Sequence, residues 1–333
     1  MSELRFEHVT VRYGAGWRAL NAVDAVDLTV PSGQVVGLVG ESGSGKSTLA
    51  RAAVGLTPLA GGRILLDGED LRRRRRPGAH RPLQMVFQDP YSSLDPRMSV
   101  GNSIAEAIPR RSIATAAARR AEVAEMLELV DLEPDHAHAY PGELSGGQRQ
   151  RVALARALAG KPDVIIADEI TSALDVSIQG TVLNLVRSLQ RRMRLSMLFI
   201  SHNLAVVRYV SDVIAVMYLG RVVECGPAAA VLADPQHPYT RELLAASPDL
   251  GAATLTEPAA DPMIQTLANA EPPDPHHPPS GCRFHTRCPV GPIVRPDRTT
   301  CVELDPADGA AARRHSSACH FSDDRLLTPD PIP

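Results

Sequence analysis

Hydrophobic and polar positions along the chain form two patterns, which predict two kinds of β-strand. Short alternating segments bounded by Gly, Pro and Asp predict antiparallel strands with one buried face, at 4–13, 25–30 and 63–67. Continuous apolar runs predict parallel strands buried on both faces, at 35–39, 164–167 and 197–200.

Each continuous run is followed by a polar element and then by a helical pattern. After the run at 164–167, apolar residues recur at helical spacing and give one apolar face, formed by Ile178, Val182, Leu185, Val186 and Leu189. Strands that alternate with helices in this way predict a doubly wound α/β sheet with crossover helices. The alternating segments add an antiparallel β subdomain.

The rest of the chain divides into a helical insertion, a linker and a tail. From about 89 to 160 the strand signals stop, which predicts a helical subdomain inserted into a main domain that spans 1–245. Eight prolines and little periodicity over 247–280 predict a linker at 246–280, before a cysteine-containing extension at 281–333. No internal repeat is visible, so we expect a single copy of the main domain.

Composition and charge exclude some classes of protein. With 333 residues and 44% hydrophobic content the chain can fill a large core, and its net charge of −3 gives no reason to expect nucleic acid as a partner. No apolar run approaches the roughly 18 residues of a membrane-spanning helix, and residues 1–7 lack the features of a secretory signal. We therefore expect a cytosolic chain that meets a membrane through its partners.

A phosphate-binding loop follows the first continuous apolar run. Residues 40–47, Gly-Glu-Ser-Gly-Ser-Gly-Lys-Ser, fit a pattern in which backbone N–H groups cradle phosphates, the Lys reaches the β and γ phosphates and the hydroxyl meets Mg²⁺. The predicted nucleotide-binding residues are Gly40, Ser42, Gly43, Gly45, Lys46, Ser47 and Thr48.

Two carboxylates end the second apolar run, at the edge of an open α/β sheet where ligands bind. We expect Asp168 to hold Mg²⁺, directly or through water, and Glu169 to polarise the attacking water. Phosphoryl transfer needs neutralised phosphate charge and a water held in line, so other polar loops should converge there. Gln88 and His202, which follow two further apolar runs, are the candidates.

The pentapeptide Leu-Ser-Gly-Gly-Gln at 144–148 precedes a strong helix-forming segment at 149–158. Its glycines are expected to expose N–H groups and the positive end of the helix dipole, which makes an anion site without side-chain bulk. The motif lies about a hundred residues beyond the phosphate loop, inside the helical insertion, so it need not face the nucleotide of its own chain.

With these motifs the chain resembles the nucleotide-binding subunit of an ATP-binding cassette (ABC) transporter. The resemblance implies a P-loop NTPase core of the ABC type and a head-to-tail dimer, in which one subunit covers the ATP bound at Lys46 of the other. The covering residues would be Ser145, Gly147 and Gln148. Gln88 would contact Mg²⁺ or the water, and His202 would act as a switch at the γ-phosphate.

Other positions are interpreted through the same resemblance. Residues 172–175, Ser-Ala-Leu-Asp, match the dimer-interface loop, and Asp175 would couple the two sites. Tyr13 is expected to stack on the adenine, with Trp17 as its rival. Where the family commonly has Pro after the Glu, this chain has Ile170, which removes no catalytic group. The five arginines at 72–76 are interpreted as an exposed turn without a function.

Four of the five cysteines, Cys282, Cys288, Cys301 and Cys319, fall in the extension. In a cytosolic chain this clustering favours a metal or redox centre, and the spacing leaves iron–sulfur, zinc and free thiols open. Residues 237–244, 281–289 and 319–320 resemble the C-terminal extension of oligopeptide and dipeptide importer ATPases, some of which carry a 4Fe-4S cluster there. The resemblance therefore implies a cluster on these four residues, while Cys225 is a separate packed or surface thiol.

The implied function is ATP hydrolysis for a peptide importer, at the cytoplasmic face of the cell membrane. ATP, Mg²⁺ and the cluster are the implied cofactors. The implied partners are an identical or paralogous ATPase subunit, two integral-membrane permease subunits and, through the complex, an extracytoplasmic substrate-binding protein; nucleic acid is not one of them. The stretch 88–96 resembles a member that pairs with a sister ATPase, which favours a heterodimer. The alternatives are a soluble ABC ATPase acting on nucleic acid or the ribosome, and an importer of nickel or another small solute.

Overall fold

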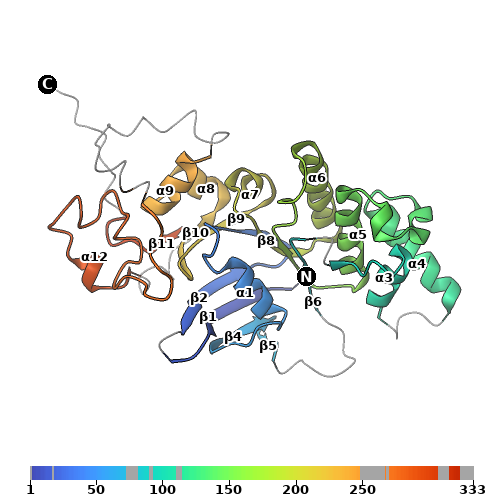
Figure 1. The fold of residues 1–333 in the computed structure, drawn as a ribbon, viewed down its shortest axis with the longest axis horizontal. Helices are drawn as coiled ribbons and strands as arrows, with labels where there is room; N and C mark the ends of the chain where they lie inside the picture. Colours follow the sequence, from blue (N-terminus) through green and yellow to red (C-terminus); the bar gives the residue numbers. More distant parts are fainter. Residues whose placement is uncertain are drawn as a thin grey trace.

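The fold combines two β-sheets, a helical insertion and a C-terminal extension (Figure 1). The computed structural model describes residues 2–16, 19–72, 82–89, 93–109, 115–247, 267, 270–306 and 315–322. Along the longest axis, the helical insertion forms one end of the molecule and the C-terminal extension forms the opposite end (Figure 1). The two sheets lie between them.

The alternating segments form an antiparallel sheet, as predicted. Its strand order is β2-β1-β4-β5, with β1 at Leu4–Tyr13, β2 at Leu20–Val30, β4 at Gly61–Leu66 and β5 at Glu69–Asp70. The second strand begins five residues before the predicted segment at 25–30. Ala25 has a φ of 48° and the β1–β2 register shifts nearby, so a bulge interrupts the alternation inside one long strand.

The continuous apolar runs lie in a seven-stranded sheet of order β11-β10-β9-β3-β8-β7-β6. Its parallel part contains β6 (Leu83–Val86), β7 (Val164–Asp168), β8 (Ser196–Ile200), β3 (Val35–Val39) and β9 (Val213–Tyr218). The antiparallel edge contains β10 (Arg221–Pro227) and the two-residue β11 (Ser316–Ser317). The prediction of a doubly wound parallel sheet is confirmed, although the sequence patterns singled out neither β9 nor β10.

Two helices connect consecutive parallel strands: α6 (Val176–Met193) lies between β7 and β8, and α7 (Leu204–Val210) lies between β8 and β9. The helix α1 (Lys46–Ala53) follows β3, and α8 (Ala228–Ala233) and α9 (Pro238–Ala245) follow β10. The predicted apolar face of α6 packs into the core, where its residues Val182, Leu185, Val186 and Leu189 are buried and Ile178 is partly buried.

The insertion is helical, as predicted. It contains α3 (Val100–Ala107), α4 (Ala116–Leu129), the 3₁₀ turns η2 (Pro134–His138) and η3 (Pro141–Glu143), and α5 (Gly146–Ala159). Ser99 and Thr115 cap α3 and α4, because each side chain accepts a hydrogen bond from a backbone N–H three residues ahead.

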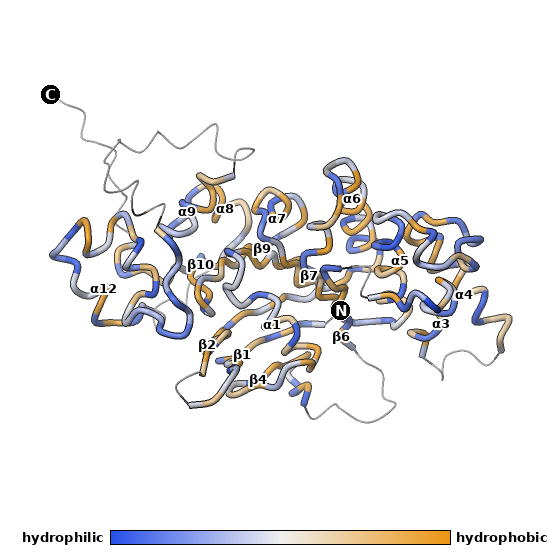
Figure 2. The backbone as a smooth tube through the Cα atoms, in the orientation of Figure 1, coloured by the Kyte–Doolittle hydropathy of each residue, from blue (hydrophilic) through white to orange (hydrophobic). Residues whose placement is uncertain are grey.

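Two hydrophobic clusters lie on opposite faces of the parallel sheet. One face packs on α1 and the antiparallel sheet, and the other packs on the helices α3 to α7. Figure 2 shows hydrophobic positions gathered along β7 and β9 in the middle of the molecule. Because both faces are covered, residues that project from strand ends are the ones that reach ligands.

The extension packs against the edge of the seven-stranded sheet that carries β10. Phe284 is buried with its ring centroid 5.3 Å from that of Tyr218 on β9 and 5.5 Å from that of Tyr239 on α9. The short helix α12 (Thr300–Glu303) and β11 belong to this segment.

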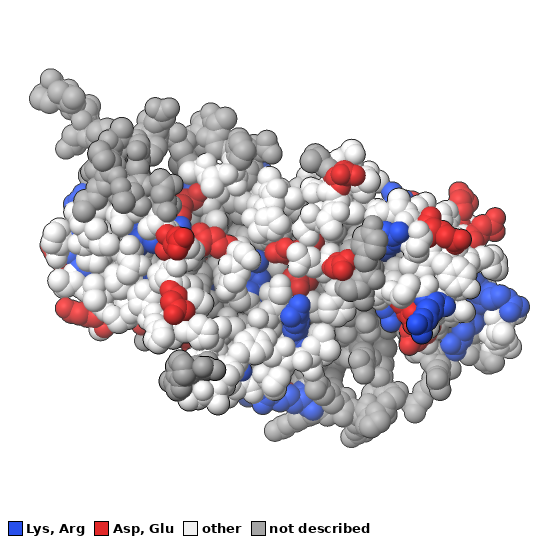
Figure 3. Space-filling view, in the orientation of Figure 1, with Lys and Arg blue, Asp and Glu red and all other residues white. Residues whose placement is uncertain are grey.

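Acidic and basic side chains are interspersed on the face shown in Figure 3, and both kinds gather at the end formed by α3 and α4. Within the described part of the chain, none of the helices has the length and apolar character needed to cross a bilayer.

Candidate nucleotide-binding site

The phosphate loop joins β3 to α1 and depends on its glycines. Gly40 has a φ of 155° and Gly45 a φ of 106°, both in the region that favours glycine. A Cβ on Gly40 would lie 2.1 Å from the carbonyl oxygen of Met217, and one on Gly45 would lie 2.2 Å from that of Ala22. Neighbouring backbone therefore fixes the path of the loop, and no side chain fits at these two positions.

Lys46 lies folded over the loop. Its Nζ donates hydrogen bonds to the carbonyl oxygens of Gly40 and Glu41, both at 2.8 Å, and to the hydroxyl of Ser44 at 3.3 Å. Burial lowers the pKa of this amine, although the carboxylates at the end of β7 oppose the change. The Lys46 ammonium group is therefore shielded from water, and the nearby carboxylates do not fully compensate for this loss. Such a group is suited to bind an anionic ligand.

Ser47 and Asp168 form the facing pair that the sequence predicts. The Ser47 hydroxyl donates a 2.9 Å hydrogen bond to Oδ1 of Asp168, which is buried at the end of β7. Burial raises the pKa of this carboxyl, and the charge of Glu169 raises it further. A hydroxyl beside an under-compensated carboxylate is a donor set that suits Mg²⁺.

Glu169 meets the two polar residues that follow neighbouring strands. Its Oε2 accepts a 3.0 Å hydrogen bond from Nε2 of Gln88 after β6, and lies 3.4 Å from Nδ1 of His202 after β8. Glu169 has a φ of 47°, which turns its side chain away from the line of β7. Ile170 is buried in the core, so the residue that replaces the common Pro serves packing. The structure thus brings the polar side chains of Glu169, Gln88 and His202 together, as the sequence predicts.

The last three residues of the pentapeptide, Gly146 to Gln148, form the first turn of α5. Ser145 is the N-cap residue: its hydroxyl accepts from the N–H of Gln148 at 3.3 Å, and Oε1 of Gln148 accepts from the N–H of Ser145 at 2.9 Å. The helix starts at Gly146, so the glycines lie within it, whereas the sequence pattern predicted that they precede it. A Cβ on Gly147 would lie 2.7 Å from Cγ2 of Ile178, so this glycine lets α5 approach α6.

The pentapeptide does not take part in the hydrogen bonds of its own phosphate loop that the structure describes. Gln148 instead lies with its Nε2 3.3 Å from Nε2 of His136 in η2. Asp175, from the predicted interface loop, is exposed at the N-cap position of α6.

The remaining predicted residues lie at the margins of the site. Tyr13 ends β1 with 42% of its surface exposed, as a base-stacking residue requires, whereas its rival Trp17 lies outside the described residues. Thr48 occupies the first turn of α1. Residues 73–76 of the arginine run also lie outside the described part of the chain.

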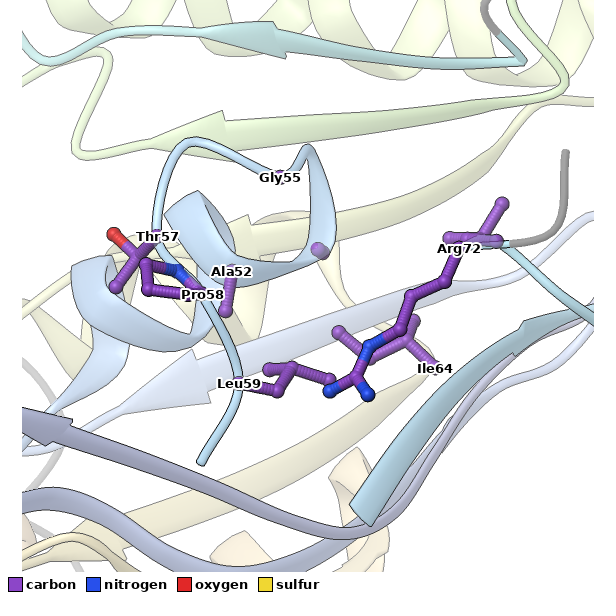
Figure 4. A pocket seen from close by; sticks show the side chains of 9 residues that line it. Ala52, Gly55, Thr57, Pro58, Leu59, Ile64 and Arg72 are labelled. Carbon is purple, nitrogen blue, oxygen red and sulfur yellow. The ribbon is translucent and has the colours of Figure 1, made fainter. Parts of the chain in front are cut away.

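A cavity of about 310 Å³ lies at the opposite end of α1 from the phosphate loop (Figure 4). Its lining includes Ala52, Pro58 and Leu59, and the Arg72 side chain extends across it toward Leu59 and Ile64 (Figure 4). This lining is mainly apolar and contains none of the predicted nucleotide-binding residues, so we assign the cavity no role in nucleotide binding.

Sequence patterns missed two side chains that contact the phosphate loop, those of Tyr239 and Arg287. The N–H of Glu41 donates a 2.9 Å hydrogen bond to the hydroxyl of Tyr239 on α9. Both carboxylate oxygens of Glu41 lie 3.3 Å from Nη1 of Arg287, in the extension. Glu41 occupies a variable position of the loop pattern, and its partners lie far along the chain, so no local signal indicates these contacts.

The four cysteines of the extension lie close enough for their charges to interact. Burial, together with the charges of neighbouring cysteines, raises the pKa of Cys282 and of Cys288 to about 12. Burial also raises the pKa of Cys301 and Cys319. Cys225 is a separate thiol on β10. Burial raises its pKa to about 11, as expected for a packed residue.

Backbone N–H groups point at three of these sulfur atoms. The donors are the N–H groups of Phe284 to Cys282, Val290 to Cys288 and Phe321 to Cys319, each two residues after its cysteine. In the described part of the chain, however, no group of three or more His, Cys, Asp or Glu residues could hold a metal ion. The iron–sulfur cluster therefore stays a prediction.

The geometry around the phosphate loop is that of a P-loop ATPase. Residues 23–172 match the family described as ABC transporter, and residues 223–293 match the family described as oligopeptide/dipeptide transporter, C-terminal region. The chain belongs to the ABC transporter family, as an ABC-type ATPase.

Two curated relatives match almost the whole chain. A probable peptide ABC transporter ATP-binding protein of Sinorhizobium fredii is 43% identical, over 98% of this chain and 94% of the relative. A di/tripeptide transport ATP-binding protein of Pseudomonas aeruginosa is 46% identical, over 93% of each chain.

Solved structures resemble the main domain. The ATP-binding cassette MJ0796, in a dimeric post-hydrolysis state bound to ADP and phosphate, is 28% identical with a TM-score of 0.60 and covers 68% of this chain and 98% of its own. The cbiO1 protein of Clostridium perfringens is 27% identical, with a TM-score of 0.61, over 69% of this chain and 90% of its own.

Proposed function

We propose that this ATPase is the ATP-hydrolysing subunit of a dipeptide or oligopeptide importer. The observation that carries the proposal is the extension: residues 223–293 match a region described for oligopeptide/dipeptide transporters, and relatives that span nearly the whole chain carry peptide-transport names. These findings favour peptide import over the two alternatives, a nucleic-acid or ribosome ATPase and an importer of nickel or another solute.

In this proposal, residues at the sheet edge hold the nucleotide and Mg²⁺. Lys46 exchanges its loop carbonyls for phosphate oxygens, and Ser47, Asp168 and Gln88 would hold Mg²⁺, which supplies neutralising charge to the phosphates. Glu169 orients and polarises the water, while His202, 3.4 Å from it, responds to the γ-phosphate. The loop N–H groups and Thr48 bind phosphate, and Tyr13 stacks on the adenine.

A complete site requires a second cassette in this proposal. Ser145, Gly147 and Gln148 lie at the start of α5, where helix N–H groups favour an anion, and their hydrogen bonds stay within the insertion. They would cover the ATP of a partner subunit, which is either identical or, our first choice, paralogous. The similar cassette MJ0796 is described as dimeric, which supports this arrangement.

The two cassettes would act on two permease subunits at the cytoplasmic face of the membrane. A substrate-binding protein outside the membrane would deliver the peptide. ATP-driven closure of the cassettes would then move the permeases between inward-facing and outward-facing states. The complex should therefore be purified and tested as a whole.

Glu169→Gln tests the assignment of the water-activating residue in that complex. We expect ATP turnover to fall by about a hundredfold or more, because Gln cannot accept a proton, while ATP binding persists. Turnover is measured by phosphate release and binding by calorimetry. Glu125→Gln, at an exposed position of α4, makes the same chemical change away from the site and is the control. Turnover by Glu169→Gln at the wild-type rate would refute the assignment.

Transport itself is measured with the complex in liposomes. We expect ATP-dependent uptake of labelled di- or tripeptides only when a peptide-loaded binding protein is present. Uptake of Ni²⁺ without peptide uptake would contradict the peptide assignment but not the ATPase. Co-purification with ribosomes or DNA in place of permeases would overturn the importer.

We also propose that Cys282, Cys288, Cys301 and Cys319 bind a 4Fe-4S cluster. Two observations support this proposal: the N–H of Cys282 donates a 2.9 Å hydrogen bond to the carbonyl oxygen of Cys301, and N–H groups directed at three of the sulfur atoms would stabilise thiolates. A cluster spreads its four cysteines over four iron atoms, so the thiols need not converge on one point as they do around a single ion.

Anaerobic purification tests the cluster. We expect a brown protein with about four iron and four sulfide per chain, and a loss of both in Cys288→Ser. Cys225→Ser is the matched control and should keep the iron. A colourless protein without iron would exclude the cluster, and stoichiometric zinc without sulfide would replace it with a zinc site.

A further inference from the structure

The phosphate loop is connected to the extension through Glu41. The backbone of this residue faces the nucleotide site, because its carbonyl oxygen accepts a 2.8 Å hydrogen bond from Nζ of Lys46. Its side chain points the other way, with both carboxylate oxygens 3.3 Å from Nη1 of Arg287. One residue thus contacts both the lysine that is expected to bind phosphate and the extension.

Arg287 is placed to hold that residue firmly. Its side chain is only 5% exposed, and its second terminal nitrogen forms an ion pair with Glu242 on α9. The guanidinium carbon lies 5.8 Å from the ring centroid of Phe284, which is itself packed between β9 and α9. A buried guanidinium with two carboxylate partners has little freedom to move, and removing it would leave those charges uncompensated.

A second contact restrains the same peptide. The N–H of Glu41 donates to the hydroxyl of Tyr239, whose ring lies 4.6 Å from that of Tyr218 at the end of β9. Elements far along the chain therefore restrain Glu41 at its N–H and at its carboxylate. The carbonyl oxygen of Glu41 accepts the hydrogen bond from Lys46.

We propose that Arg287 is a positioning residue of the ATP site: through Glu41 it sets the conformation of the phosphate loop and hence the affinity for nucleotide. The extension is then a part of the ATPase and not only an appendage. This inference needs only the ATPase activity of the chain, and it stands whether or not the transported solute is a peptide.

A double-mutant cycle on the full-length chain tests the proposal. Binding of a non-hydrolysable ATP analogue with Mg²⁺ is measured by calorimetry for Arg287→Met, once in the wild-type background and once in the Glu41→Gln background. We expect Arg287→Met to weaken binding about tenfold when Glu41 is present and less than about twofold in the Glu41→Gln background. The cycle removes any direct effect of the Glu41 charge on the phosphates.

Arg283→Met is the matched control. Arg283 anchors the same extension, since its guanidinium contacts Asp24 on β2 and the carbonyl oxygen of Leu219, but it has no contact with the phosphate loop among its described partners. We expect it to lower the thermal midpoint as Arg287→Met does while nucleotide affinity stays within about twofold of wild type. Arg287→Lys, which keeps the charge, should lose only about threefold in affinity, compared with about tenfold for Arg287→Met.

Two results would overturn the proposal. Equal loss of affinity in the Arg283 and Arg287 variants would mean that any loosening of the extension disturbs the site. An effect of Arg287→Met that is as large in the Glu41→Gln background as with Glu41 would show that the arginine does not act through Glu41. If Arg287→Met does not accumulate, the same cycle is run with Arg287→Lys, with an expected loss of about threefold.

Discussion

Lys46 and Asp168, the buried ionisable residues in the nucleotide site, would each be stabilised in their charged form by ATP and Mg²⁺. Burial lowers the pKa of Lys46 and raises that of Asp168, so the loss of water disfavours the charged form of both groups. Phosphate beside the amine and Mg²⁺ beside the carboxyl would reverse both effects. Folding alone gains little from such groups, which is why they indicate a ligand site.

His237 is a buried titratable group with a structural role. Its ring Nδ1 accepts a 3.1 Å hydrogen bond from the N–H of Tyr239 at the start of α9, so the ring is neutral. Burial, with a smaller contribution from the nearby charge of Arg241, lowers its pKa to about 3. Protonation would remove the acceptor that caps the helix.

Lowering the pH should therefore destabilise the chain through His237. Below about pH 6.5 an unfolded histidine binds a proton, whereas the native His237 does so only near 3, so stability is full above 6.5 and is lost toward 3. We expect about 1 kcal/mol less stability at pH 5.5 than at pH 7 from this residue. His237→Asn, which keeps a capping oxygen, should remove this part of the dependence.

Urea unfolding at pH 7 and pH 5.5 measures the effect. His8→Asn is the control, because the His8 side chain is 79% exposed. The assignment to His237 would be wrong if both variants kept the wild-type difference between the two pH values.

At the scale of elements, two glycines in neighbouring helices serve different purposes. Gly147 allows α5 to approach Ile178 on α6, whereas a Cβ on Gly180, inside α6, would meet nothing within 4 Å. One glycine is thus required by packing and the other is not.

Alanine substitutions should separate the two cases. We expect Gly180→Ala to raise the free energy of unfolding by about 0.5–1 kcal/mol, because alanine is the better helix former. Gly147→Ala should lower it by about 1 kcal/mol, because its methyl group would crowd Ile178. Thermal and urea midpoints measure both, and stabilisation by Gly147→Ala would contradict the close approach of the helices.

The hydrophobic pattern predicts a strand well when the strand is buried in the same way along its whole length. Residues 35–39 and 164–167 are apolar because helices or sheets cover both faces, so sequence alone identifies β3 and most of β7. The start of β2 escapes prediction because the bulge at Ala25 reverses the alternation. The sequence also reveals Asp168 and Gln88, because they are polar residues at or just after the end of an apolar strand. It does not reveal Arg287, whose contact with Glu41 forms only in the folded chain.

At the scale of the whole molecule, the phosphate loop and the pentapeptide of one chain are parts of two different sites in our proposal. The pentapeptide belongs to the helical insertion, and the loop belongs to the central sheet. An isolated chain should therefore bind ATP but hydrolyse it slowly. Assembly with a partner subunit should supply the missing groups.

Ser145→Arg distinguishes action within the chain from action on a partner. The isolated variant should bind ATP within about twofold of wild-type affinity, whereas the assembled transporter that contains it should lose most of its ATPase activity. Lys46→Ala is the comparison, since it should abolish binding already in the isolated chain. Weak ATP binding by isolated Ser145→Arg would mean that the pentapeptide serves its own phosphate loop.

The pairing of β11 with β10 covers part of a sheet edge, which we expect to limit aggregation. Two residue pairs, Glu224 with Ser317 and Cys225 with Ser316, cover part of a strand that would otherwise be the edge of the sheet. Uncovered edge strands can pair with other chains. A chain truncated before residue 281 would thus lose more than a contact to its ATP site: it would expose backbone groups on β10 to any strand it met, and its solubility would fall with increasing concentration.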